Sequence, residues 1–126
     1  MKFSEAVIEG LKEVKPSNVY YLREEQDGGC VACAIGAALH YTLGVRNLST
    51  DVEDKLIQAF PWTGKPGRDT TIAHEMMQEI SGLFEGVVNG QKDFQVVIDY
   101  ADRMEAKYGE PARVELSLQE NEFATI

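Results

Sequence analysis

Cysteine and histidine are the residue types that could do chemistry in this chain, and there are two of each: Cys30, Cys33, His40 and His74. Cys30 follows Gly28-Gly29 and precedes an apolar run, so we expect it in the first turn of a helix. Free amide groups and the helix dipole stabilise a thiolate at such a position. The pattern is therefore compatible with a thiol nucleophile, but it favours a small apolar cysteine at a tight packing position.

The stretch from Gln26 to Cys30 resembles the nucleophile segment of papain-like cysteine hydrolases, at a shorter Gln–Cys spacing than in papain. Those enzymes place a cysteine at the start of a buried helix and a glutamine upstream. The resemblance implies a thiol-dependent hydrolase or transferase that uses Cys30 and needs a histidine base. His40 lies about 15 Å along the same expected helix. His74 is therefore the candidate base.

Metal and redox sites are the other chemistry that these residue types suggest. A C-x2-C pair begins many zinc sites, but the chain has no second pair at ligand spacing. His74-Glu75 starts an H-E-x-x-H pattern, and Gln78 stands where the second histidine belongs. Thioredoxin-type chemistry needs a βαβ setting that the sequence does not suggest. We therefore expect no metal site and no cofactor.

The element that must position Cys30 is an uncharged run of small residues, which predicts a buried helix over about 29–43 that closes at Gly44. A helix that is apolar all round leaves no face for water, and this one is shorter than the roughly 20 residues that span a bilayer. Gly36 in its middle predicts that a neighbouring helix or an aromatic ring lies where a Cβ would be. A larger residue there should destabilise by about 1–3 kcal/mol.

Apolar residues at helical spacing predict four further helices. Two of them are expected at Glu5–Val14, with Ser4 as cap, and at Asp51–Phe60, with a Thr50–Glu53 capping box. The next is capped by Asp69 or Thr70 and has Ser81-Gly82 as its candidate end, and the last runs from Asp93 to Tyr108. Ser17–Leu22 fits either a strand or a helical turn. Arg113–Leu118 alternates like a strand, with Val19–Leu22, a second subunit or nothing as its partner.

The sequence thus predicts a mainly α fold, a single domain over 1–126 with about five helices bundled around the buried helix. The formal net charge of −9 repels nucleic acid phosphates and anionic lipid, so we expect neither nucleic acid nor membrane as a partner. The N-terminus carries no secretory signal, and two cysteines in an apolar run indicate reduced thiols. We therefore expect a cytoplasmic protein.

The segments Cys33–Ala38 and Leu43-Gly44 resemble those of a group of small uncharacterised bacterial and phage proteins with a Cys-Ala-Leu-Gly-Ala type helix. Ile80–Glu85 and Phe94–Ile98 are similar to later segments of that group, although Phe84-Glu85 replaces its Asn-Asp pair. The resemblance implies a helical fold and no activity.

From the sequence we expect a non-enzymatic binding or regulatory module of a cytosolic bacterial or phage system, with a protein partner or self-association. The alternative is the thiol-dependent enzyme with Cys30 and His74.

Overall fold

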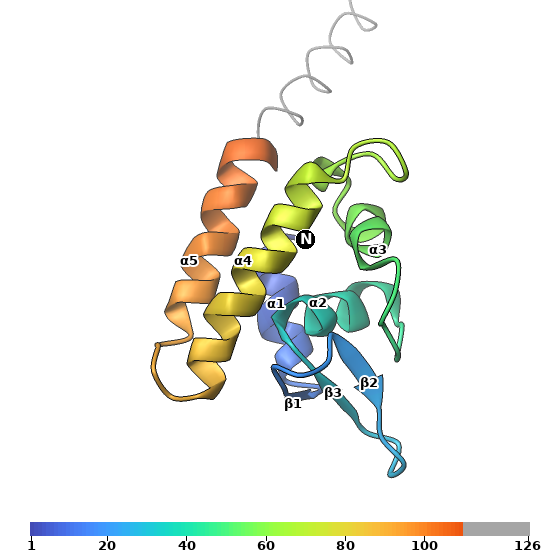
Figure 1. Cartoon of the computed structure of the whole chain (residues 1–126), viewed down its shortest axis with the longest axis vertical. Coiled ribbons are helices and arrows are strands. Elements are labelled where there is room, and N and C mark those ends of the chain that lie inside the picture. The colour runs from blue at the N-terminus through green and yellow to red at the C-terminus, as the bar shows by residue number, and fades with distance from the viewer. Residues whose placement is uncertain (110–126) are drawn as a thin grey trace, which may run out of the picture.

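The computed structural model describes residues 1–109, which are mainly helical with a small sheet (Figure 1). The five α-helices are α1 (Phe3–Leu11), α2 (Ala34–Leu43), α3 (Val52–Ala59), α4 (Thr71–Val88) and α5 (Gln95–Met104). A 3₁₀ turn (Pro61–Thr63) follows α3, and a π-helical turn (Glu105–Gly109) follows α5. No helix in this part of the chain is long and apolar enough to cross a membrane. The strand expected at Arg113–Leu118 lies outside the described residues.

Three short strands form a sheet at one end of the molecule: β1 (Lys15–Pro16), β2 (Leu22–Glu24) and β3 (Cys30–Ala32). The order is β1-β3-β2, with β3 parallel to β1 and antiparallel to β2. The helix predicted over 29–43 is therefore wrong at its start, because its first residues form the central strand. Gly28-Gly29 close the β2–β3 hairpin, in which the Glu25 amide donates to the Gly29 carbonyl at 2.7 Å.

Helix α2 has a fully buried first half, Ala34–Leu39, and touches neighbouring backbones on two sides. A Cβ on Gly36 would lie 1.5 Å from the Tyr21 carbonyl oxygen. A Cβ on Gly10 of α1 would lie 2.0 Å from the Ala37 carbonyl oxygen. The close approach expected at Gly36 is therefore present, but the backbone of the bend just before β2 makes it, rather than a helix or an aromatic ring.

The limits of the other helices differ from expectation where tertiary packing prevails over local signals. Helix α1 begins at Phe3, so Ser4 is a buried residue within it and not its cap. Helix α4 continues through Ser81-Gly82 to Val88, because an exposed glycine in mid-helix costs only about 1 kcal/mol.

Helix α3 begins without the predicted Thr50–Glu53 capping box, since no side chain caps it. Asp51 precedes its first turn in a left-handed conformation, with φ of 56°. At the start of α5, the predicted cap Asp93 accepts a hydrogen bond from the Gln95 amide at 2.8 Å.

One hydrophobic cluster runs through the described residues and ties the first helix to the last. The rings of Phe3 and Phe60 meet edge to face with centroids 5.0 Å apart. The Phe3 amide donates to the buried Glu105 carboxylate at 3.0 Å. Trp62 lies half-buried against this cluster, as a cover over it.

We predict that Gly36→Ala and Gly10→Ala each lower the free energy of unfolding by about 1–3 kcal/mol. The new methyl group would overlap a backbone carbonyl oxygen, which can move only if its backbone segment moves with it. Urea denaturation measures the change. Gly82→Ala is the matched control, because nothing lies within 4 Å of its Cβ position, and it should stabilise α4 by about 0.5–1 kcal/mol. Wild-type stability in Gly36→Ala would contradict the packing described here.

Candidate functional site

Cys30, the predicted nucleophile, lies in the central strand β3 and not at a helix N-terminus. It is 4% exposed, and its Sγ lies 3.9 Å from the Arg46 carbonyl oxygen, to which it donates. The Arg46 guanidinium in turn donates to the Glu24 carboxylate and the Gly28 carbonyl. Cys30 is therefore part of the contact that fastens the β2–β3 hairpin to the chain following α2.

Cys33 occupies the helix N-terminal position that the sequence suggested for Cys30. It is the residue immediately before α2, and it is 5% exposed. Burial raises the pKa of its thiol, although the amides of Gly36, Ile35 and Cys33 itself act in the opposite direction. Because burial has the largest effect, the Cys33 thiol is protonated at neutral pH. A protonated thiol is typical of a cysteine that packs in a core, whereas a nucleophile needs the thiolate.

The two histidines each have partners away from the thiols. His74 is exposed on α4, and its Nδ1 lies 3.2 Å from Glu53 Oε1 on α3. His40 Nδ1 lies 2.8 Å from the Val45 carbonyl oxygen, and its Nε2 lies 3.5 Å from Glu13. Within residues 1–109 no hydrogen bond joins a cysteine to a histidine, so the structure does not bring Cys30 and His74 together. The same residues hold no group of three or more His, Cys, Asp or Glu that could bind a metal ion.

A pocket of about 190 Å³ lies beside the Cys33 thiol, and we call it the Cys33 pocket. The residues that line it are Asn18, Val19, Tyr20, Tyr21, Cys33 and Ser81. The Cys33 amide donates to the carbonyls of Tyr20 and Tyr21, both at 3.2 Å, and this holds the 18–21 segment against the start of α2. Ser81, on α4, lines the pocket from outside this segment.

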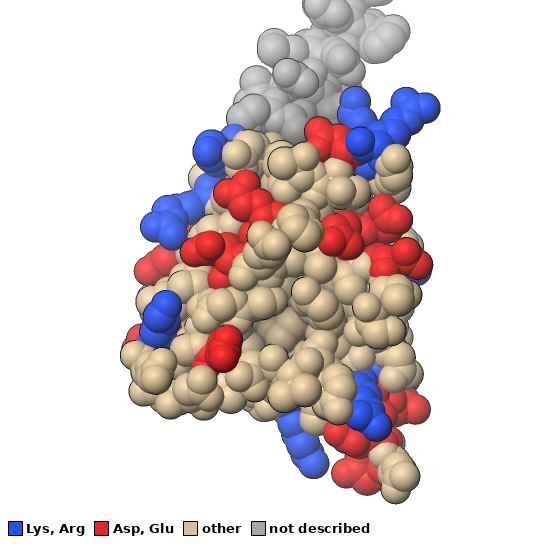
Figure 2. All heavy atoms as spheres, viewed as in Figure 1, with Lys and Arg blue, Asp and Glu red and all other residues tan. Residues whose placement is uncertain are grey.

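The rim of the Cys33 pocket is open to solvent and mixed in character, because the apolar Val19 stands between the exposed Asn18 and Tyr20, whose hydroxyl accepts a hydrogen bond from Arg23. Val19 is 74% exposed and Tyr20 is 41% exposed, side by side in the sequence. Figure 2 shows a hollowed, uncharged area on the face that carries α4, with acidic side chains around and above it. Sequence analysis missed this pocket, since the only local signal was the two adjacent tyrosines in the ambiguous segment Ser17–Leu22.

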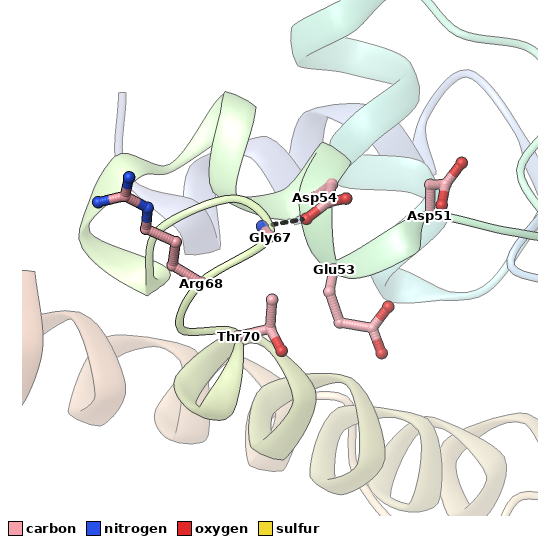
Figure 3. A pocket seen from close by; sticks show the side chains of 6 residues that line it. All are labelled: Asp51, Glu53, Asp54, Gly67, Arg68 and Thr70. Atoms are coloured by element: carbon pink, nitrogen blue, oxygen red, sulfur yellow. Dashed lines mark hydrogen bonds between the residues drawn. The ribbon is translucent and has the colours of Figure 1, made fainter.

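A second hollow, of about 300 Å³, lies between the start of α3 and the loop before α4 (Figure 3). Asp54 accepts the Gly67 amide at 3.3 Å, and this bond fixes the loop. Glu53 extends toward α4, while the Arg68 side chain points away from the three carboxylates that line the hollow. The hollow is polar and acidic, and two of its carboxylates have partners, since Asp54 bonds the loop and Glu53 bonds His74.

Comparisons with protein families, with curated proteins and with solved structures find no match for this chain. The resemblance to small bacterial and phage helical proteins therefore stays a prediction, and function has to be argued from geometry alone.

We predict that iodoacetamide modifies Cys33 slowly in the native protein at pH 7–8, because burial raises the thiol pKa above its ordinary value of 9.0. The rate should rise only above that pH or on unfolding in urea. Peptide mapping by mass spectrometry separates Cys33 from Cys30. Rapid native labelling of Cys33 at pH 7 would contradict the buried, protonated thiol.

We predict a pH-dependent contribution from Glu53, whose pKa lies below its ordinary 4.5 because its own backbone amide, and then His74, favours the ionised form. A lowered pKa in the folded state adds stability above the unfolded pKa, and this is lost as the pH falls through the folded value. Glu53→Gln should therefore destabilise at pH 7 by at most about 1 kcal/mol. Urea titrations should show the difference shrink as the pH falls below the ordinary pKa of 4.5, and a difference that does not shrink in acid would contradict this account.

Proposed function

We propose that the protein is a non-enzymatic binding or regulatory module that receives an apolar side chain of a protein partner in the Cys33 pocket. The observation that carries the proposal is the pair of exposed side chains Val19 and Tyr20 on the rim of that pocket. Single exposed apolar residues are ordinary on protein surfaces. Two adjacent ones beside a hollow offer a place where a partner's side chain can be buried, and they are the feature on which the proposal rests.

The chemistry of the thiols supports binding over catalysis. A cysteine nucleophile needs a thiolate and a base within hydrogen-bond reach. Burial opposes the thiolate at Cys33, and the Cys30 thiol donates to a backbone carbonyl. The alternative enzyme, with Cys30 as nucleophile and His74 as base, would need both residues to leave the places where they now lie.

Charge supports a protein partner in place of nucleic acid, since the net charge of −9 repels phosphates. We also propose a cytoplasmic location, because Cys30 and Cys33 are both free and buried, as reduced thiols would be. In this proposal the helices bundle around α2, which acts as a scaffold and takes no part in a reaction.

We predict that Val19→Asp abolishes partner binding without loss of stability, because Val19 is largely exposed and a carboxylate on the rim disfavours an apolar ligand. The measurement is quantitative mass spectrometry of proteins retained by the tagged chain. Ile8→Asp is the matched control, since Ile8 is an exposed apolar residue on α1 at 39% exposure. Light scattering of the same variants shows whether the partner is a second copy of the chain.

A protein retained by wild type and by Ile8→Asp, and lost from Val19→Asp, is the expected result. Equal retention by all three chains would contradict docking at the Cys33 pocket.

A further inference from the structure

Arg23, on β2, is held beside the Cys33 pocket by one of the residues that line it. Its Nη1 donates to the Tyr20 hydroxyl at 2.8 Å, and its guanidinium lies over the Tyr20 ring, 4.9 Å from the centroid. Two contacts with one side chain therefore restrict where the cation can lie. The ion pairs of residues 1–109 do not include Arg23, so its positive charge has no carboxylate partner there.

A third hollow, of about 450 Å³, lies on the solvent-facing side of the sheet beside this arginine, and we call it the sheet hollow. The strand register places Lys15 and Arg23 on either side of Val31, in one row across the three strands. Residues opposite each other on neighbouring strands point to the same face. Val31 alternates with the buried Cys30 and Ala32, so this row lies on the face toward solvent.

The charges around the sheet hollow are arranged in order along β2. The residues that line it are Lys15, Arg23, Glu25, Gln26, Asp27 and Val31. Asp27 has partners of its own, since one carboxylate oxygen accepts the Gly29 amide at 2.9 Å and the other lies 3.8 Å from Lys15 Nζ. Glu25 lies at the hairpin turn, two residues beyond Arg23. The hollow is therefore positive beside Tyr20 and negative toward the turn.

The contact between Tyr20 and Arg23 lies between two hollows. Tyr20 lines the Cys33 pocket, and Arg23 lines the sheet hollow. A partner segment that fills both hollows must therefore cross the guanidinium. In an extended segment every second side chain points to the same side, at a spacing of about 6.6 Å. The first of three such side chains can enter the Cys33 pocket, the second can contact Arg23, and the third can lie over Val31.

We propose that the protein partner binds as an extended segment across both hollows and that Arg23 selects an acidic side chain within it. This inference rests on the proposed function and specifies the chemistry of the partner. Tyr20 engages only Nη1, so the guanidinium keeps N–H groups that can donate to a carboxylate. A C-terminal carboxylate would end the partner chain at Arg23 and leave the sheet hollow empty. The acidic group therefore belongs to an internal Glu or Asp of the partner.

The probe is the blocked pentapeptide acetyl-Leu-Ser-Glu-Ser-Val-amide, whose first, third and fifth side chains point to one side when it is extended. The matched peptide has Gln in place of Glu and carries no charge. Affinity for the full chain is measured by NMR titration at low salt. The assigned amides of Val19, Cys33 and Val31 are the reporters, so both hollows are observed.

We predict that the wild-type chain binds the Glu peptide about threefold to fivefold more tightly than the Gln peptide, as expected for one exposed ion pair. Arg23→Gln should remove this preference and leave the affinity for the Gln peptide within about twofold of wild type. Tyr20→Phe removes the hydroxyl that holds the guanidinium, so the preference should fall to about twofold. Arg68→Gln is the matched control, because Arg68 is also exposed and without an ion pair within residues 1–109, and it should keep the full preference.

An undiminished preference in Arg23→Gln, or an equal loss in Arg68→Gln, would overturn the role of Arg23, because the peptide would then respond only to net charge. Acetyl-Ser-Leu with a free C-terminal carboxylate, bound as tightly as the Glu peptide, would overturn an internal acidic residue as the ligand. Equal binding of both pentapeptides by wild type, lost for both in Val19→Asp, would support docking at the Cys33 pocket and overturn selection by Arg23. Unchanged Val19 and Cys33 amides with both pentapeptides would contradict docking at the Cys33 pocket itself.

Discussion

Two close backbone contacts, at Gly10 and at Gly36, hold helix α2 against its neighbours in the described part of the chain. Gly10 lets α1 rest on the Ala37 carbonyl, and Gly36 lets the Tyr21 carbonyl rest on α2. At both points the two backbone segments touch with no side chain between them. Helix α2 is therefore held from two sides at backbone separations that only glycine permits. The hydrogen bonds from the Cys33 amide to Tyr20 and Tyr21 complete this arrangement and hold the sheet against the helices.

The surface features that concern function follow from this packing. Because Tyr21 is held against α2, the preceding residues Val19 and Tyr20 project from the surface and border a hollow. Helix α4 provides Ser81 to the same hollow.

The sequence predicted what periodicity can encode and missed what depends on distant contacts. Four helices were predicted because apolar residues recur at helical spacing in each, and α2 was predicted because its residues are small and uncharged. Strand β3 was missed because three residues, Cys30–Ala32, are too few to show alternation and continue an alanine-rich run. That error moved the helix start and selected Cys30 over Cys33. The Cys33 pocket could not be predicted, since it exists only where the 18–21 segment meets α2 and α4.

The most direct test of the central claim is native-state hydrogen exchange of the α2 amides. If α2 is held from both sides, the amides of Ala38–Leu43 should exchange only through global unfolding, with an opening free energy equal to that from urea denaturation. Exchange of these amides by local opening, at a clearly lower free energy than those in the middle of α4, would contradict the account.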